Sequence, residues 1–226
     1  MVMVTLTEQD HAIVREAVAQ AELKSSGEIV TIITDQSDTY GDIALAWAAA
    51  VSLTLLTILS FEHAFLLDWY AGLHDAWNAA WLPADLFAMA AGVGIFSFLI
   101  VWLAQLWLPL RFAMVPGRVK DARVQDRAID LFRVGAENLT SGRTGILIYL
   151  SMREHRAEIL ADEAIAAKVP PETWGDAMGA MLGHMKEGRI ADGLAAAVSE
   201  VGDVLAEHLP RADDDENELP DRLIHL

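Results

Sequence analysis

Acidic side chains flank the stretches of this sequence that are richest in β-branched residues. Asp35 and Asp38 come shortly after one such stretch, Asp162 follows another, and Glu28 opens the first. Carboxylate oxygens are the hard ligands that Ca²⁺ or Mg²⁺ prefers, and strand ends in α/β sheets are common ligand positions. We therefore predict Asp35, Asp38 and Asp162 as metal ligands and Glu28 as a binding candidate. A cation there would polarise a phosphoryl group or activate water, which is the chemistry of a metal-dependent phosphatase.

A structural role is the alternative for these acids. Asp and Glu make up 33 of the 226 residues, so solvated loop positions and helix caps are expected among them. Asp192 is a binding candidate that also suits the positive N-terminus of a helix. Arg143 is a candidate for binding phosphate or for pairing with an acid. His63 and the pair His74-Asp75 could hold a metal, although isolated histidines among aromatic residues more often only snorkel.

Composition excludes several classes of protein. The sequence has no Cys, which excludes disulfide scaffolds, cysteine nucleophiles and thiolate zinc sites. Its net charge of −17 argues against binding to nucleic acid, which needs a basic surface. No Walker A loop, Rossmann glycine pattern, HExxH, GxSxG or kinase signature occurs. The residues therefore supply no obvious pair of nucleophile and base, and they do not establish an enzyme.

Two uncharged stretches hold the apolar excess of a sequence that is 54% hydrophobic. Residues 43–61 run for 19 positions without a charge, and residues 86–108 run for 23. A bilayer core about 30 Å thick needs about 20 apolar residues in a helix. The alternative is a pair of buried helices in a soluble bundle, while the polar residues before the first stretch argue against a signal peptide. The two stretches predict a transmembrane hairpin with a connector at 62–85.

Lys and Arg predict the orientation of this hairpin in the lipid bilayer. The connector contains neither residue type, whereas five basic residues follow the second stretch, namely Arg111, Arg118, Lys120, Arg123 and Arg127. The positive-inside rule then places the connector outside and both termini in the cytoplasm. Neither stretch contains an ionisable residue, so an anchor is expected rather than a transport path.

Small residues four positions apart predict how the two helices meet. Such spacing allows close approach of membrane helices. A short connector also keeps the two helices at high effective concentration. We therefore expect the second stretch to pack against the first through its small residues. We expect no obligate dimer through this surface. The residues concerned are Ala88, Gly92, Ala90 and Gly94 in the second stretch and Ala46, Ala50 and Ser52 in the first.

The remaining sequence predicts one soluble domain in two parts. Residues 1–42 contain capping residues, a helical stripe and the β-branched run 28–34. One helix and one strand bury too little surface to fold alone, so they need partners. Residues 109–209 supply them, with a helical pattern at 118–140, strands at 146–151 and 156–161 that are predicted to form a β-hairpin, and two further helices.

The predicted fold class is therefore α/β. A small mixed sheet lies between helices in an α/β/α sandwich, interrupted by the two-helix transmembrane hairpin. The acidic end of the sequence, residues 210–226, is charged and poor in apolar residues, and it is predicted to be disordered.

Four short segments resemble the TPM domain, a family named for a thylakoid-lumen protein, a photosystem II repair factor and an acetylcholine-receptor modulator. The segments are SSGEIV at 25–30, TGILI at 144–148, EILAD at 158–162 and GRIADGL at 188–194. The resemblance extends over about 1–42 and 118–209. It implies a small sheet between helices, with phosphatase activity and metal binding in some members.

Two functions follow from these observations. The first is a membrane-anchored TPM-like domain that binds a protein partner or small ligand and acts in the assembly, repair or regulation of membrane proteins. The alternative is a metal-dependent phosphatase that uses Ca²⁺ or Mg²⁺. The absence of intramembrane charge and of a catalytic motif favours the first.

Overall fold

The computed structural model describes residues 6–62, 64, 67–68, 71–72, 83–135, 144–211 and 223–226. Contacts within the chain divide it into two units. Met1–Asp38 together with Gly117–Leu226 form the first, called here the α/β unit. Thr39–Pro116 form the second, called here the hairpin unit. One unit is therefore built from two parts of the chain that are 78 residues apart, the length of the inserted segment 39–116.

A four-stranded mixed sheet forms the centre of the α/β unit, in the order β3-β2-β1-β4. β1 is parallel to both of its neighbours, β2 and β4, whereas β3 is antiparallel to β2. The strands are β1 (Glu28–Thr34), β2 (Gly145–Ser151), β3 (Arg156–Ala161) and β4 (Leu223–His225). The predicted mixed sheet is confirmed, and the three strands expected from the sequence begin and end within one residue of the predicted positions.

The fourth strand corrects one prediction. Residues 210–226 were expected to be disordered, but Leu223–His225 pair with Thr31–Ile33 of β1, and the amide of Leu226 donates to Ile33 O at 3.0 Å. Leu223 is only 5% exposed. The acidic run 213–216 lies outside the described residues. The prediction failed because two apolar residues after a charged run carry too short a signal for a strand.

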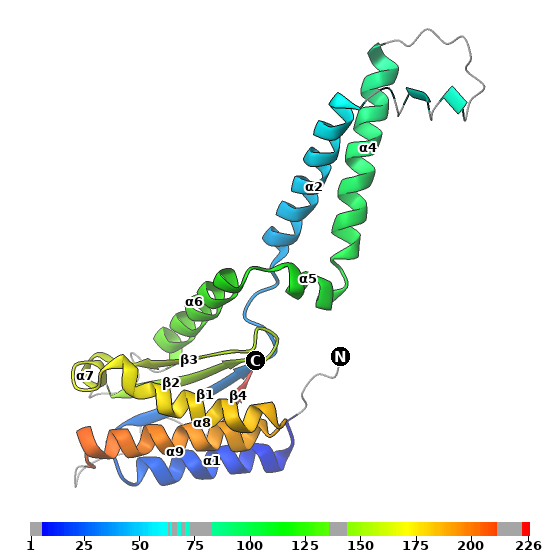
Figure 1. Cartoon of the computed structure of the whole chain (residues 1–226). Coiled ribbons are helices and arrows are strands. Elements are labelled where there is room, and N and C mark those ends of the chain that lie inside the picture. Colours follow the sequence, from blue (N-terminus) through cyan, green and yellow to red (C-terminus); the bar gives the residue numbers. More distant parts are fainter. Residues whose placement is uncertain are drawn as a thin grey trace. The chain divides into compact units, whose positions relative to one another are not determined.

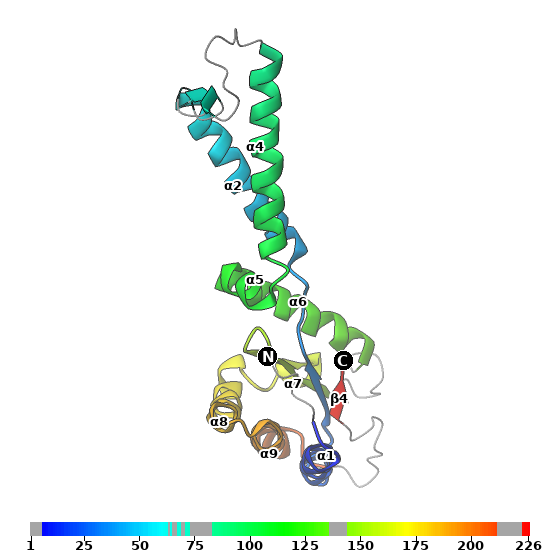
Figure 2. The same cartoon turned by 90° about the vertical axis from the view of Figure 1, so that its right-hand side faces the viewer.

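Helices cover both faces of the sheet, as Figures 1 and 2 show. One face carries three long helices, and the other carries one. The three are α1 (Glu8–Glu22), α8 (Trp174–Lys186) and α9 (Ile190–His208), and the single helix is α6 (Gly117–Gly135). The short helix α7 (Glu163–Ala166) and the 3-10 turn η1 (Pro171–Thr173) connect β3 to α8. The α/β/α arrangement of layers is that expected from the sequence.

Alternation along each strand divides the core between these two faces. In β1, Ile29 and Ile33 pack under α1, α8 and α9, whereas Val30 and Ile32 pack under α6. All seven residues of β1 are buried. A central strand that is covered on both sides is mostly apolar, and this agrees with the β-branched run at 29–34.

Local signals in the sequence set the helix ends. Thr7 and Asp10 form a capping box, in which the Asp10 amide donates to Thr7 Oγ1 at 3.2 Å and the Thr7 amide donates to Asp10 Oδ2 at 2.8 Å. Gly188 follows α8 with a φ of +77°, a conformation that favours glycine. These ends agree with the predictions from the sequence.

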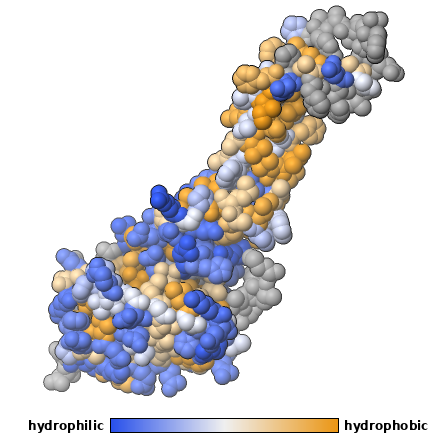
Figure 3. All heavy atoms as spheres, viewed as in Figure 1, coloured by the Kyte–Doolittle hydropathy of each residue, from blue (hydrophilic) through white to orange (hydrophobic). Residues whose placement is uncertain are grey.

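The hairpin unit includes two long apolar helices and a short helix that follows them. They are α2 (Gly41–Phe61), α4 (Pro83–Ala104) and α5 (Leu108–Met114). Both long helices have the length and composition to cross a membrane. Figure 3 shows their mostly hydrophobic surface. The second helix was expected at 86–108 but runs from Pro83 to Ala104, and the chain turns before α5 begins at Leu108 with Pro109 in its first turn.

Small residues do pack between α2 and α4, but at different positions from those expected. Ser52 Oγ donates to Gly94 O at 2.9 Å, and an added Cβ on Gly94 would lie 3.2 Å from Leu56 Cδ1. Gly92 faces open space. The buried residues of α2 are Ala44, Ala48 and Ser52, whereas Ala46 and Ala50 are exposed. The predicted contact surface is therefore wrong for Gly92, Ala46 and Ala50. These residues lie two positions from residues that do pack between the helices, and two positions correspond to a rotation of about 200° around the helix axis.

Polar contacts connect the start of α2 with the end of α4. The buried Gln105 amide donates to Ala44 O at 3.0 Å and to Val101 O at 3.2 Å. Arg111 Nε donates to Gln105 O at 2.9 Å, and its Nη1 donates to Thr39 O at 3.2 Å. These bonds join the start of α2 to the end of α4.

Candidate functional site

The two ends of the parallel strands separate the predicted metal ligands. Thr34 lies opposite Ser151, so Asp35 and Asp38 follow the carboxyl edge of β1 and β2. Asp162 follows β3, which returns antiparallel, and its amide donates to Gly145 O at 2.9 Å at the amino edge. Six residue steps separate these edges, and at about 3.3 Å per step the distance is about 20 Å.

This geometry corrects the predicted three-carboxylate metal site. A cation holds its oxygen ligands at about 2.3–2.6 Å, so Asp162 cannot share one with Asp35 and Asp38. Within the described ranges, no group of three His, Asp or Glu side chains could hold a metal ion. The prediction failed because β1 pairs parallel to β2, so β3, which returns antiparallel from β2, ends at the edge opposite Asp35 and Asp38. His63, His74, Asp75 and Arg143 lie outside the described residues.

A buried chain of hydrogen bonds lies at the carboxyl edge instead. Tyr149 OH and Ser37 Oγ are 2.9 Å apart, Ser37 Oγ donates to Ser151 Oγ at 2.9 Å, and Ser151 Oγ donates to Glu154 Oε2 at 2.6 Å. The Ser37 amide donates to Glu154 Oε1 at 3.0 Å. Glu154 is 2% exposed, and Tyr149 and Ser151 are fully buried. These four residues are called here the carboxyl-edge network.

The direction of the donors shows what this network can do. Ser37 gives its single proton to Ser151, so Tyr149 must donate to Ser37, and every hydroxyl proton is directed toward Glu154. Burial raises the pKa of Tyr149, and its hydrogen bond with Ser37 opposes this rise. Ser151 and Tyr149 are fully buried, so their hydroxyl groups are out of reach of a substrate in this structure. The network stabilises a buried carboxylate and fixes the backbone around it.

Further contacts hold the segment after β1. The amides of Met152 and Arg153 donate to Thr34 O and Asp35 O, each at 3.0 Å. Arg123 Nε on α6 lies 3.3 Å from Asp38 Oδ2. Asp38 is the last residue of the α/β unit before the hairpin unit. The carboxyl edge therefore anchors the point at which the chain leaves the sheet.

The amino edge holds two of the other predicted residues. Glu28 and Asp162 are each 5% exposed. Asp162 caps α7, because its Oδ1 accepts the Glu163 amide at 2.7 Å, and its Oδ2 has no hydrogen bond within the described part of the chain. Glu28 donates its amide to Thr144 O at 3.1 Å. For Asp162 the expected structural role as a helix cap is confirmed.

Asp192 lies in a polar groove between the N-terminal ends of α1 and α9. The groove has a volume of about 420 Å³, and Thr7, Asp10 and Arg189 also line it. Asp192 Oδ2 is 3.1 Å from Arg189 Nη1, and Arg189 also pairs with Glu187. Asp192 is in the first turn of α9, where a negative charge is favourable. Its guanidinium partner is thus already neutralised by two carboxylates.

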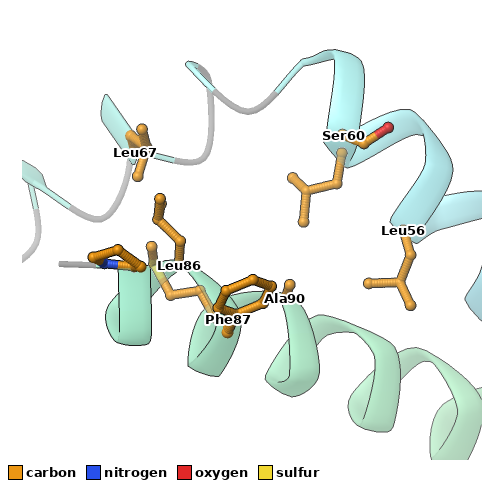
Figure 4. Close-up of a pocket in the computed structure, with 9 residues that line it drawn as sticks. Leu56, Ser60, Leu67, Leu86, Phe87 and Ala90 are labelled. Atoms are coloured by element: carbon orange, nitrogen blue, oxygen red, sulfur yellow. The ribbon is translucent and has the colours of Figure 1, made fainter. Parts of the chain in front are cut away.

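The hairpin unit has an apolar cavity of about 440 Å³ between α2 and α4. Figure 4 shows Leu56 and Ser60 of α2 on one side and Leu86, Phe87 and Ala90 of α4 on the other. The Ser60 hydroxyl donates to Thr57 O at 2.7 Å, so it directs no free donor into the cavity. This cavity suits an apolar group only.

Sequence reasoning missed all four members of the carboxyl-edge network. Ser37 lies in the loop after β1, and Glu154 lies in the turn between β2 and β3. The two are in contact although 117 positions separate them in the sequence. A weak signal was present, because Ser151 ends a strand that is otherwise apolar apart from Tyr149. Buried polar groups in such positions need partners, but the sequence does not show which ones.

Comparisons with known proteins agree with this fold. Residues 108–204 match the TPM domain family, whose label includes the word phosphatase. The chain is similar in structure to the BA42 protein of the psychrophilic bacterium Bizionia argentinensis, solved by NMR, with a TM-score of 0.56 and 18% identity over 100% of this chain and 99% of that one. At this identity the similarity concerns the fold alone. No curated protein matches the chain.

Proposed function

We propose that this chain is a membrane-anchored domain of TPM type that binds a protein partner and acts in the assembly, repair or regulation of membrane proteins. One observation supports the proposed membrane anchor. α2 and α4 are 21 and 22 residues long. Of the most apolar 18-residue segment of each helix, only 17% is buried in α2 and 6% in α4. Core helices of a soluble protein would be mostly buried, and an exposed apolar surface of this length suits a bilayer.

The interior of the hairpin unit supports an anchor over a transport path. Its buried polar contacts are backbone-directed, with Ser52 donating to Gly94 O and Gln105 donating to Ala44 O. Such bonds tie two helices together without an ionisable side chain. Five basic residues lie within 111–127, soon after α4, which supports a cytoplasmic location for both termini and an outer location for the connector.

The α/β unit supports binding over catalysis. Tyr149, Ser151 and Glu154 of the carboxyl-edge network are buried, so a substrate does not reach them in this structure. Arg189, which lines the polar groove, is paired with Asp192 and Glu187. A domain with these features holds a surface in place next to the membrane, where a protein partner could use it.

The topology is tested with reporter fusions to the full chain. Fusions before Leu6 and after Leu226 are expected to report cytoplasm, and an insertion in the connector is expected to report the outside. A single fusion on the opposite side would refute the membrane hairpin, because the α/β unit is built from both flanking parts.

The partner is tested by chemical crosslinking of the full chain in native membranes, followed by capture in detergent. An unrelated two-span protein with the same tag is the control. We expect a membrane protein that is recovered repeatedly above the control and whose assembled fraction falls when this chain is deleted. Recovery at the level of the control, or normal assembly after deletion, would count against the proposal.

The family label favours a second candidate, a metal-dependent phosphatase. Asp35 and Asp38 share the carboxyl edge, so a Ca²⁺ or Mg²⁺ site would have to use these two and not Asp162. The purified chain should then hydrolyse a phosphomonoester only with the divalent cation, and Asp35→Asn should abolish the activity while Asp162→Asn leaves it. Hydrolysis that persists with chelator and with Asp35→Asn would remove this candidate.

A further inference from the structure

β3 forms one edge of the sheet. The strand order ends at β3, whose partner on the inner side is β2. All six residues of β3 are half-buried, whereas all seven of β2 are buried. Within the described part of the chain, no strand pairs with the outer side of β3. Its outer backbone groups are therefore open to another strand.

The register identifies these outer groups. The Asp162 amide donates to Gly145 O, so these two residues form a hydrogen-bonded pair, and such pairs recur at every second residue along β3. Arg156, Glu158 and Leu160 therefore direct their backbone groups toward β2. The N–H and C=O groups of Ala157, Ile159 and Ala161 point outward. These three residues offer a ladder to an added strand.

The charge beside this ladder favours one kind of strand. The Glu158 side chain lies on the face covered by α6, near Asp121, while Arg156 forms an ion pair with Asp121. Burial raises the pKa of Glu158, and the charge of Asp121 raises it further. Glu158 has no cationic partner within the described residues.

We propose that the outer edge of β3 binds an extended, basic segment of a protein partner as a fifth strand of the sheet. The backbone groups of Ala157, Ile159 and Ala161 would form the ladder, and a Lys or Arg of the segment would lie beside Glu158. In an antiparallel pairing the residue opposite Glu158 is a non-hydrogen-bonded one, whose side chain approaches most closely. This inference rests on the protein partner of the proposed function and names its docking site.

Two other roles for this edge are outcomes of the test. Charged residues on an edge strand can serve to block pairing, in which case no strand binds. A second copy of the chain could also pair through β3, which would appear as a dimer in analytical ultracentrifugation that Glu158→Lys changes. Either result would overturn the proposal.

The probe is a labelled nine-residue peptide of alternating Thr and Val with a central Lys, titrated with the full chain in detergent and followed by fluorescence anisotropy. The two valines beside the lysine direct their N–H groups to β3, and the two threonines two positions away direct theirs outward. N-methylation of those two valines should abolish binding, and N-methylation of those two threonines should leave it within about twofold. Equal effects of the two modifications, or no binding up to about 1 mM, would refute the added strand.

Charge reversal tests the role of Glu158. Glu158→Lys should move the preference from a peptide with central Lys to one with central Glu by about three- to tenfold, which is the size expected for cross-strand charge pairs. Glu16→Lys makes the same change on the exposed surface of α1 and should leave the preference unchanged. An equal response of both variants would show a nonspecific charge effect. If the peptide experiments fail but the native partner is still captured from membranes, the β3 docking site is refuted and the proposed function stands.

Discussion

The carboxyl-edge network makes a quantitative prediction for Glu154→Ala. The variant removes the acceptor of two donors, the half-buried Ser37 amide at 3.0 Å and the buried Ser151 hydroxyl at 2.6 Å. Each hydrogen bond to a charged group contributes about 1.5–3 kcal/mol, and each orphaned donor retains its desolvation cost. Removing the buried charge offsets part of this loss. We expect a net loss of about 3 kcal/mol.

The assay is thermal unfolding in detergent, with hydrogen exchange to locate the effect. For a chain of this size about 3 kcal/mol lowers Tm by about 6–12 °C. The amide of Ser37 and the turn from Met152 to Glu154 should lose protection first, since Glu154 holds the two segments together. Glu200→Ala on the exposed face of α9 is the matched control and should shift Tm by less than about 2 °C.

A double-mutant cycle separates the network from simple loss of packing. Ser151→Ala alone and Glu154→Ala alone should not add, because each removes the same 2.6 Å bond. A Tm for Glu154→Ala within the range of the control, or full additivity with Ser151→Ala, would refute the cooperative network.

Three further predictions concern packing and titration. Gly94→Val should lower hairpin stability by about 1–3 kcal/mol by overpacking, whereas Gly92→Val, which faces open space, should be neutral in detergent melts. The hydrogen bonds from Thr7 lower the pKa of Asp10, so the capping contribution is present above the unfolded pKa and is lost as pH falls through the lower folded pKa. Thr7→Ala should therefore lose about 1 kcal/mol at neutral pH and less in acid, and an equal loss at both would contradict the cap. The pKa of Glu158 in the folded protein is raised, so its ionisation destabilises the fold as pH rises. Glu158→Gln should therefore raise Tm at pH 7 and leave it unchanged at pH 3. A lower Tm at pH 7 would contradict the conclusion that the Glu158 carboxylate has no cationic partner.

Local patterns in the sequence determined the elements of this protein. The β-branched run at 29–34 predicted β1, because a strand covered on both faces is mostly apolar. The spacing of Thr7 and Asp10 predicted the start of α1, since both partners of a capping box lie within one turn. Two uncharged stretches predicted α2 and α4, because length and composition alone decide whether a helix can span a bilayer.

Only the tertiary structure decided which of these residues meet. The antiparallel return of β3 was predicted as a hairpin, but the parallel pairing of β1 with β2 was not, and this pairing places Asp35 at the edge opposite Asp162 and removes the predicted metal site. The contact between Ser37 and Glu154, the pairing of β4 and the position of β3 at the edge of the sheet depend on strand order across more than a hundred residues. Helix and strand periods are encoded within a few neighbours, whereas pairing is chosen by burial over the whole fold. The sequence therefore determined the elements and their apolar faces, and the packing of distant segments decided the network and the edge.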